Sequence, residues 1–116
     1  MEVHKTIFSP YMAALSHNIA QLLPGDLDFS FFCNSGAEAV EGAIKLAYKF
    51  HDGDRKIILH SDISYHGKLL GSASITASKE VHFKYPSIPN THIFKFNDIS
   101  SVKEKISSFR CISIIR

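Results

Sequence analysis

The clearest hydrophobic pattern in the chain runs from residue 34 to residue 50. Its apolar positions follow the three-and-four spacing of one helix face: Val40, Ala43, Ile44, Ala47 and Tyr48. The charged side chains Glu41, Lys45 and Lys49 fall largely on the other face. This alternation predicts an amphipathic helix that buries one side.

The predicted helix is preceded by an aromatic, extended-looking run from Phe29 to Cys33, which we interpret as a strand. Asn34–Gly36 then forms a tight turn between strand and helix. The short apolar run Lys56–His60 is typical of a buried parallel strand. Strand, helix and strand in this order predict a right-handed βαβ unit.

The rest of the chain continues the alternation of helices and strands. A first helix begins at Ser9–Pro10 and ends at Pro24–Gly25, where the residue types suit a helix start and stop. The later segments are a helix of small residues over Lys68–Thr76, an aperiodic surface excursion over Ala77–Pro89, a strand over Thr91–Phe96, a helix capped by Asn97 or Asp98, and a strand over Cys111–Ile115. The expected fold class is α/β, a mostly parallel sheet with flanking helices.

The turn at the start of the central helix has the chemistry of an anion site. Backbone N–H groups at the positive end of a helix attract a phosphate. Ser35 adds a hydroxyl donor, Gly36 tolerates unusual dihedral angles, and Ala37 adds little bulk. The alternative is a purely structural cap, with Asn34 or Ser35 at the N-cap and Glu38 as the capping-box partner. The chain has neither a G-x-G-x-x-G nor a P-loop signature, so the spacing leaves both interpretations open.

A second polar loop, Ser64–Gly67, follows the second predicted strand. Ligands of α/β proteins collect beyond the carboxyl ends of parallel strands, so this loop and the turn are expected at one edge. Tyr65 could offer its ring to a flat ligand or pack on the core. His66 could hydrogen-bond near that ligand or only shape the loop. Gly67 supplies a backbone angle that other residues resist.

Composition narrows the class of protein. A chain of 116 residues with 45% apolar residues is one folded domain at most. A net charge of +2, with scattered basic residues, gives no support for nucleic acid as a partner. No run approaches the roughly 20 apolar residues of a membrane span, and the N-terminus lacks the apolar core of a signal peptide. Cys33 and Cys111 lack metal-ligand spacing, so we expect reduced thiols, no metal and a cytoplasmic protein.

Two motifs carry a family resemblance. Asn34-Ser-Gly-Ala-Glu-Ala-Val-Glu-Gly-Ala-Ile-Lys-Leu-Ala47, followed by Ser64-Tyr-His-Gly67, closely resembles the class III, pyridoxal-phosphate-dependent aminotransferases. The putrescine, ornithine and acetylornithine branch is the most similar, and the resemblance extends from about Ser9 to Ile115. It implies the large domain of a fold-type I transferase. It further implies that Ser35, Gly36 and Ala37 bind the cofactor phosphate, and that Tyr65, followed by His66, stacks on the pyridine ring.

The same resemblance implies what this chain lacks. The family's Schiff-base lysine and the aspartate that pairs with the pyridine nitrogen lie outside the matched portion, because Lys45, Lys49 and Lys68 do not align with that lysine. The substrate-binding arginine and the small C-terminal domain are likewise outside it. Residues 1–116 are therefore expected to be a partial large domain without catalytic residues, inactive alone.

Three hypotheses follow for the function. The resemblance implies a homodimeric parent that moves an amino group from a diamine or ω-amino acid to a 2-oxo acid. An alternative is an inactive truncated product that acts as a binding or interaction module. A third is an unrelated α/β module for a nucleotide or sugar phosphate.

Overall fold

The computed structural model describes residues 9–78, 86–109 and 111–115, and the chain divides into two units, residues 1–32 and 33–116. The first unit contains helix α1 (Pro10–Leu22). Ser9 caps it by accepting a hydrogen bond from the Met12 amide, and Pro10 occupies the first helical position. The helix ends at Leu23, which is extended and donates its amide to the Ile19 carbonyl oxygen, and Gly25 lies two residues beyond it with a φ of 70°. The predicted boundaries of this helix are confirmed.

The prediction of a strand at Phe29–Cys33 is wrong for this structure. Residues 27–33 have no regular secondary structure, and the rings of Phe29 and Phe31 are 98% and 75% exposed. The described strands pair with one another and leave this run outside the sheet. An extended aromatic run becomes a strand only beside a hydrogen-bonding neighbour, and sequence pattern alone does not reveal whether that neighbour is present.

The second unit holds the remaining helices and strands. In chain order they are α2 (Gly36–Phe50), β1 (Ile57–Ser61), α3 (Leu70–Ser74), β2 (Thr91–Phe94), α4 (Ile99–Ser108) and β3 (Cys111–Ile115). Each one was predicted, although the helix expected over residues 68–76 is shorter. The predicted excursion over residues 77–89 falls in large part outside the described residues.

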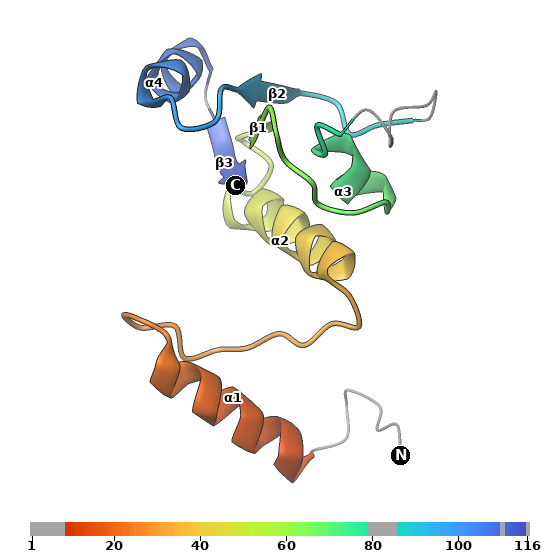
Figure 1. Ribbon diagram of the computed structural model, residues 1–116, viewed down its shortest axis with the longest axis vertical. Helices are drawn as coiled ribbons and strands as arrows, with labels where there is room; N and C mark the ends of the chain where they lie inside the picture. Colours follow the sequence, from red (N-terminus) through yellow and green to blue (C-terminus); the bar gives the residue numbers. More distant parts are fainter. Residues whose placement is uncertain (1–8, 79–85, 110, 116) are drawn as a thin grey trace. The chain divides into compact units, whose positions relative to one another are not determined.

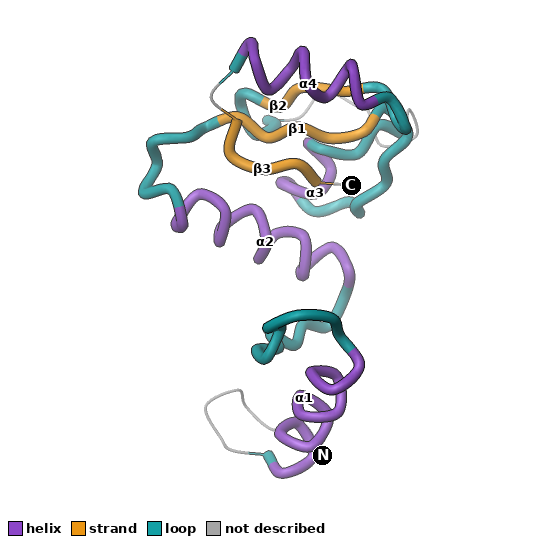
Figure 2. Tube along the Cα trace, turned by 90° about the vertical axis from the view of Figure 1, so that its left-hand side faces the viewer, coloured by secondary structure: helices purple, strands orange, loops and turns teal. Residues whose placement is uncertain are grey.

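The described strands form one parallel sheet in the order β2-β1-β3, so β1 is central. Ser61 at the end of β1 is level with Phe94 at the end of β2. Helix α4 lies on one face of the sheet, whereas α2 and α3 lie on the other (Figures 1 and 2). This confirms the α/β class. The predicted βαβ unit around α2 is wrong for this structure, because no described strand precedes α2.

The core lies between α2 and the central strand. Ile44 of α2, Ile58 of β1 and Ile75 are buried against one another, and Val40 and Tyr48 pack on them. The predicted apolar face of α2 is thus confirmed, except that Ala43 is exposed. This packing holds the middle of α2 against the start of β1 and against Ile75, which follows α3. No helix in the described part of the chain is long and apolar enough to cross a membrane.

Candidate functional site

The start of α2 is organised by hydrogen bonds between near neighbours. The Ser35 hydroxyl oxygen accepts from the Glu38 amide at 3.2 Å, and the Glu38 carboxylate accepts from the Asn34 amide at 2.8 Å. The expected structural cap therefore exists, with Ser35 at the N-cap. It does not exclude a ligand. The cap uses the Ser35 oxygen as an acceptor, and the first-turn amides of Gly36 and Ala37 have no acceptor within the helix.

Gly36 is suited to a ligand by open space rather than by an unusual backbone. Its φ is not among the positive values in the described part of the chain, so the tolerance of glycine for unusual dihedral angles is not used at this position. A Cβ built on Gly36 meets no atom within 4 Å. The space beside this residue is therefore open, and a bulky group can approach the backbone there.

Gly67 lies on the other side of this space and does require a special backbone. Its φ is 114°, which confirms the sequence expectation, and a Cβ built there would lie 2.6 Å from the Ala37 Cβ. The loop after β1 therefore approaches the first turn of α2 so closely that only glycine fits at the contact.

The loop that carries Tyr65 is anchored on both sides of that residue. The buried Ser64 hydroxyl lies 2.8 Å from the carbonyl oxygens of both Ser61 and Ile75. The His66 amide donates to the Thr76 hydroxyl at 2.9 Å. Tyr65 itself is 61% exposed, so its ring is presented and not packed into the core. This outcome favours a ring available to a ligand over a core aromatic.

His66 has an unused polar atom. Its Nε2 is buried and has no hydrogen-bond partner among the described residues. Burial lowers the pKa of the His66 imidazole below its ordinary value, because desolvation disfavours the charged form. A neutral imidazole with one unpaired nitrogen is able to accept or donate one hydrogen bond, depending on its tautomer.

The two segments share one hollow of about 360 Å³, lined by Gly36, Ala37, Val40, Tyr65, His66 and Gly67. Four of the five predicted site residues line it, while Ser35 lies at the same helix start without being in the lining. Sequence reasoning missed Val40 as a lining residue. The signal was available, because Val40 is one helical turn beyond Gly36 and shares its face.

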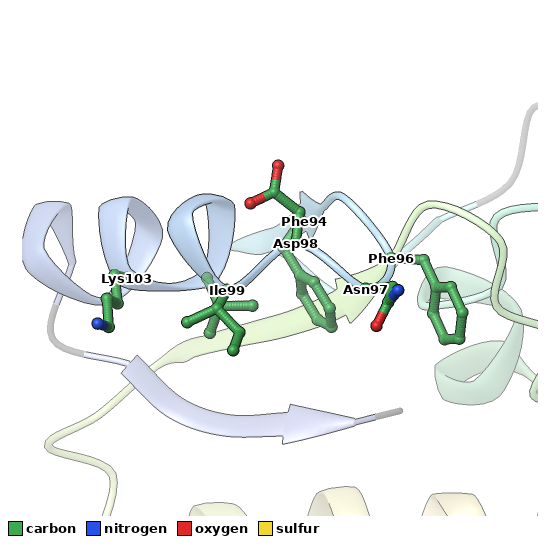
Figure 3. Close-up of a pocket in the computed structure, with 7 residues that line it drawn as sticks. Phe94, Phe96, Asn97, Asp98, Ile99 and Lys103 are labelled. Atoms are coloured by element: carbon green, nitrogen blue, oxygen red, sulfur yellow. The ribbon is translucent and has the colours of Figure 1, made fainter.

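A second hollow of the same volume lies between the end of β2 and the start of α4. Figure 3 shows Phe94, Phe96 and Ile99 pointing to one side of it, with the Asp98 carboxylate pointing to the other. Asp98 caps α4 by accepting from the Ser101 amide at 3.1 Å. The N-cap of α4 is therefore a carboxylate, which would repel a phosphate, whereas the N-cap of α2 is the neutral Ser35 hydroxyl and the Glu38 carboxylate there is bonded to the Asn34 amide.

The model of the class III aminotransferases matches residues 3–115. The chain belongs to this family. It is 39% identical over 88 residues to an acetylornithine aminotransferase of Clostridium acetobutylicum, covering 72% of this chain and 23% of that protein. It is 35% identical over 102 residues to a putrescine aminotransferase of Pectobacterium atrosepticum, covering 86% and 22%. It is 47% identical over 87 residues to an acetylornithine aminotransferase of Nostoc sp., covering 69% and 20%. The chain therefore spans less than a quarter of the length of these relatives.

Solved structures agree on the fold. An (S)-enantioselective omega-transaminase from Thermomicrobium roseum superposes with a TM-score of 0.84 at 24% identity, covering 98% of this chain and 31% of that one. An ornithine aminotransferase from Toxoplasma gondii gives a TM-score of 0.76 at 16% identity, covering 97% and 28%. The fold is that of a pyridoxal-phosphate-dependent transaminase. The third hypothesis, an unrelated phosphate module, is wrong.

The residues around the hollow fit the cofactor of the family, pyridoxal phosphate. The open space beside Gly36 and two first-turn amides suit a phosphate, and the exposed ring of Tyr65 suits a flat heterocycle. The unpaired Nε2 of His66 adds one polar group to the same lining. Lysine does not occur among the described residues that line this hollow.

Proposed function

We propose that this protein is a pyridoxal-phosphate-dependent transaminase in which the present chain supplies the phosphate cradle and the ring-stacking face. One observation carries the proposal: Gly36 and Ala37 share a hollow with Tyr65 and His66, although the two pairs come from separate segments. A phosphorylated aromatic cofactor requires a helix start that binds its phosphate and a flat side chain that stacks on its ring, both beside the same space.

Each residue has a distinct proposed task. The Ser35 hydroxyl and the amides of Gly36 and Ala37 hold the phosphate, and the Tyr65 ring covers one face of the pyridine. His66 gives a neutral hydrogen-bonding group beside that ring. When bound, pyridoxal phosphate supplies an electron sink that allows an amino group to leave its donor. These residues bind and orient, and none of them is proposed to move the reacting proton.

The proposed reaction moves an amino group from a diamine or ω-amino acid, such as putrescine, ornithine or acetylornithine, to a 2-oxo acid. The putrescine and acetylornithine aminotransferases among the relatives support this substrate class. We further propose a cytoplasmic homodimer. Proton transfer in such a reaction needs a lysine near the cofactor. We propose that this lysine lies in protein sequence outside residues 1–116. Inspection of the adjoining reading frame would show whether it encodes such a lysine.

The decisive experiment uses the longest polypeptide that the gene encodes. The purified protein is titrated with pyridoxal phosphate and then supplied with each amine and a 2-oxo acid, and the new amino acid is measured. Gly36→Val should weaken cofactor binding roughly tenfold to a hundredfold, since overfilling a site costs about 1–3 kcal/mol. Ala39→Val adds the same side chain at an exposed position of the same helix, outside the lining, and should leave the affinity unchanged.

The alternative is that the chain is a catalytically inactive binding or interaction module. The observation that favours this alternative is that lysine does not occur among the described residues that line the hollow. Cofactor binding without amino transfer, in the longest encoded polypeptide, would support it. Equal cofactor affinity in the parent and in Gly36→Val would exclude the proposed cradle in either case.

A further inference from the structure

Glu41 connects the helix that carries the proposed cradle with the segment behind the Tyr65 loop. It lies on α2, and its Oε1 accepts a hydrogen bond from the Ser72 amide of α3 at 2.7 Å. The two residues are 31 positions apart in the chain. The Ser72 amide belongs to the first turn of α3, where a helix offers it no acceptor of its own. The carboxylate therefore satisfies a donor that is otherwise left unpaired inside the protein.

The backbone of α3 is shaped to receive this carboxylate. Gly71 precedes Ser72, and a Cβ built on it would lie 2.6 Å from Glu41 Oε2 and 2.9 Å from Oε1. Gly71 and Ser72 are both buried. The glycine thus leaves space into which both carboxylate oxygens fit, and a larger residue would displace them. This fit distinguishes the contact from a chance hydrogen bond between two exposed groups.

From Ser72 a continuous path of hydrogen bonds leads to the loop. The Thr76 hydroxyl lies 2.8 Å from the Ser72 carbonyl oxygen and accepts from the His66 amide at 2.9 Å. The Ser72 hydroxyl accepts from the Leu69 amide at 3.1 Å, where the loop enters α3. Thr76 is 1% exposed and Ser72 is fully buried, so water does not compete for these bonds. Displacement of α3 would therefore displace His66 and its neighbour Tyr65.

We propose that Glu41 is a positioning residue that sets the distance between the start of α2 and the Tyr65 loop. Through Ser72 and Thr76 it holds the ring of Tyr65 where the ring and the α2 amides meet the same ligand. The inference rests on the proposed cofactor function, which it deepens, because the contact itself touches no ligand. This role also explains why Glu41 lies on α2 one turn beyond Ala37, with its carboxylate beside Gly71.

The first test needs no cofactor. Hydrogen exchange at single amides is measured by NMR in the protein and its variants. Glu41→Ala should accelerate exchange of the Ser72 and His66 amides by about tenfold or more, because a buried donor loses its acceptor. Glu41→Gln keeps an acceptor oxygen and should restore both amides. Glu104→Ala removes an exposed carboxylate from α4 and should change neither.

Should Glu41→Ala fail to fold, Glu41→Asp gives the same comparison, since it keeps the charge but withdraws the oxygens by one methylene group. Faster exchange at Ser72 alone, with His66 unchanged, would show that the carboxylate acts only locally and would overturn the proposal. Failure of Glu41→Gln to restore the two amides would overturn it as well.

The second test measures pyridoxal phosphate itself. Glu41→Ala should raise the dissociation constant about tenfold and weaken the circular dichroism of the bound cofactor, which reports how rigidly the ring is oriented. Glu41→Gln should restore both. Unchanged affinity and dichroism in Glu41→Ala would overturn the positioning role while leaving the proposed function intact. If the unmodified protein did not bind the cofactor, the proposed function would be wrong. The hydrogen-exchange result would then show only that Glu41 anchors the Tyr65 loop.

Discussion

The two sides of the hollow are built in different ways. On the α2 side, Ser35 and Glu38 bond to amides only three and four residues away, in an exposed turn. On the loop side, Ser64 and His66 bond to Ile75 and Thr76, which are 11 and 10 residues distant, and Ser64 is buried. The cradle is thus a property of one short sequence, whereas the position of the ring depends on packing between separate segments.

This difference has a functional consequence. A locally bonded turn forms whenever the helix forms, so the placement of its binding groups depends on α2 and not on bonds to distant segments. The loop bonds to the end of β1 through Ser64 and Ser61, and to the residues after α3 through Ile75 and Thr76. Because α3 is in turn bonded to Glu41 of α2, the loop acquires its shape only when β1, α3 and α2 are assembled. Changes at the buried supports of the loop should therefore lower stability more than changes in the exposed turn at the start of α2, and both kinds of change should weaken cofactor binding.

The largest effect is expected at Gly67. Gly67→Ala places a Cβ 2.6 Å from that of Ala37 on a backbone with a φ of 114°. Strain and overlap together should lower the free energy of unfolding by about 3 kcal/mol and weaken cofactor binding as well. Chemical denaturation and cofactor titration measure the two losses. Gly53→Ala is the matched control, because its φ is 77° but its Cβ meets nothing within 4 Å.

Gly53→Ala should cost about 1 kcal/mol of stability, the backbone part alone, and leave cofactor affinity unchanged. Equal losses in the two variants would show that the contact between Gly67 and Ala37 contributes nothing.

The next effect is expected at the helix cap. Ser35→Ala removes the acceptor of the Glu38 amide and should cost about 1 kcal/mol of stability. It should also weaken cofactor binding, since the same hydroxyl is a proposed phosphate donor. Asp98→Ala removes the equivalent cap of α4 and should lower stability similarly without affecting affinity. If both variants retained full affinity, the Ser35 side chain would be a structural cap only.

Much of this architecture follows from sequence because it is local. The cap at Ser35, the apolar face of α2 and the need for glycine at position 67 all depend on neighbouring residues or on backbone chemistry. The strand expected at Phe29–Cys33 depends on a partner strand, and the pattern of one segment cannot supply it.

Two further features escaped sequence reasoning for the same reason. The hydrogen bond between Glu41 and Ser72 joins residues 31 positions apart in the chain, so no local sequence pattern predicts it. Burial of the Thr76 hydroxyl beneath the loop likewise arises only when α3 docks against the strand. The sequence placed the helix start and the loop at one edge because both were expected to follow parallel strands. They do share one hollow, but no described strand precedes α2, so the reason is the packing of α2 and not the order of strands.

A smaller effect is expected at Tyr65, and only on affinity. Tyr65→Ala should weaken cofactor binding by about 1 kcal/mol, the value of one aromatic stacking contact. Stability should not change, since the ring is 61% exposed. Tyr65→Phe retains the ring face and should bind like the parent, as measured by the same titration. Loss of affinity in Tyr65→Phe would assign the role to the hydroxyl group and contradict stacking.

The smallest effect is a pH dependence at His66, which tests whether the loop side carries a neutral imidazole. Burial lowers the folded-state pKa below the ordinary 6.5, so between these two pKa values the unfolded chain binds the proton more tightly. The contribution of His66 to the free energy of unfolding is therefore complete above about pH 6.5 and declines as the pH falls towards the lowered pKa. His66→Gln should remove this part of the slope. Identical pH profiles for the parent and His66→Gln, measured by urea denaturation from pH 5 to about pH 8, would show that the imidazole is as well solvated in the folded protein as in the unfolded chain.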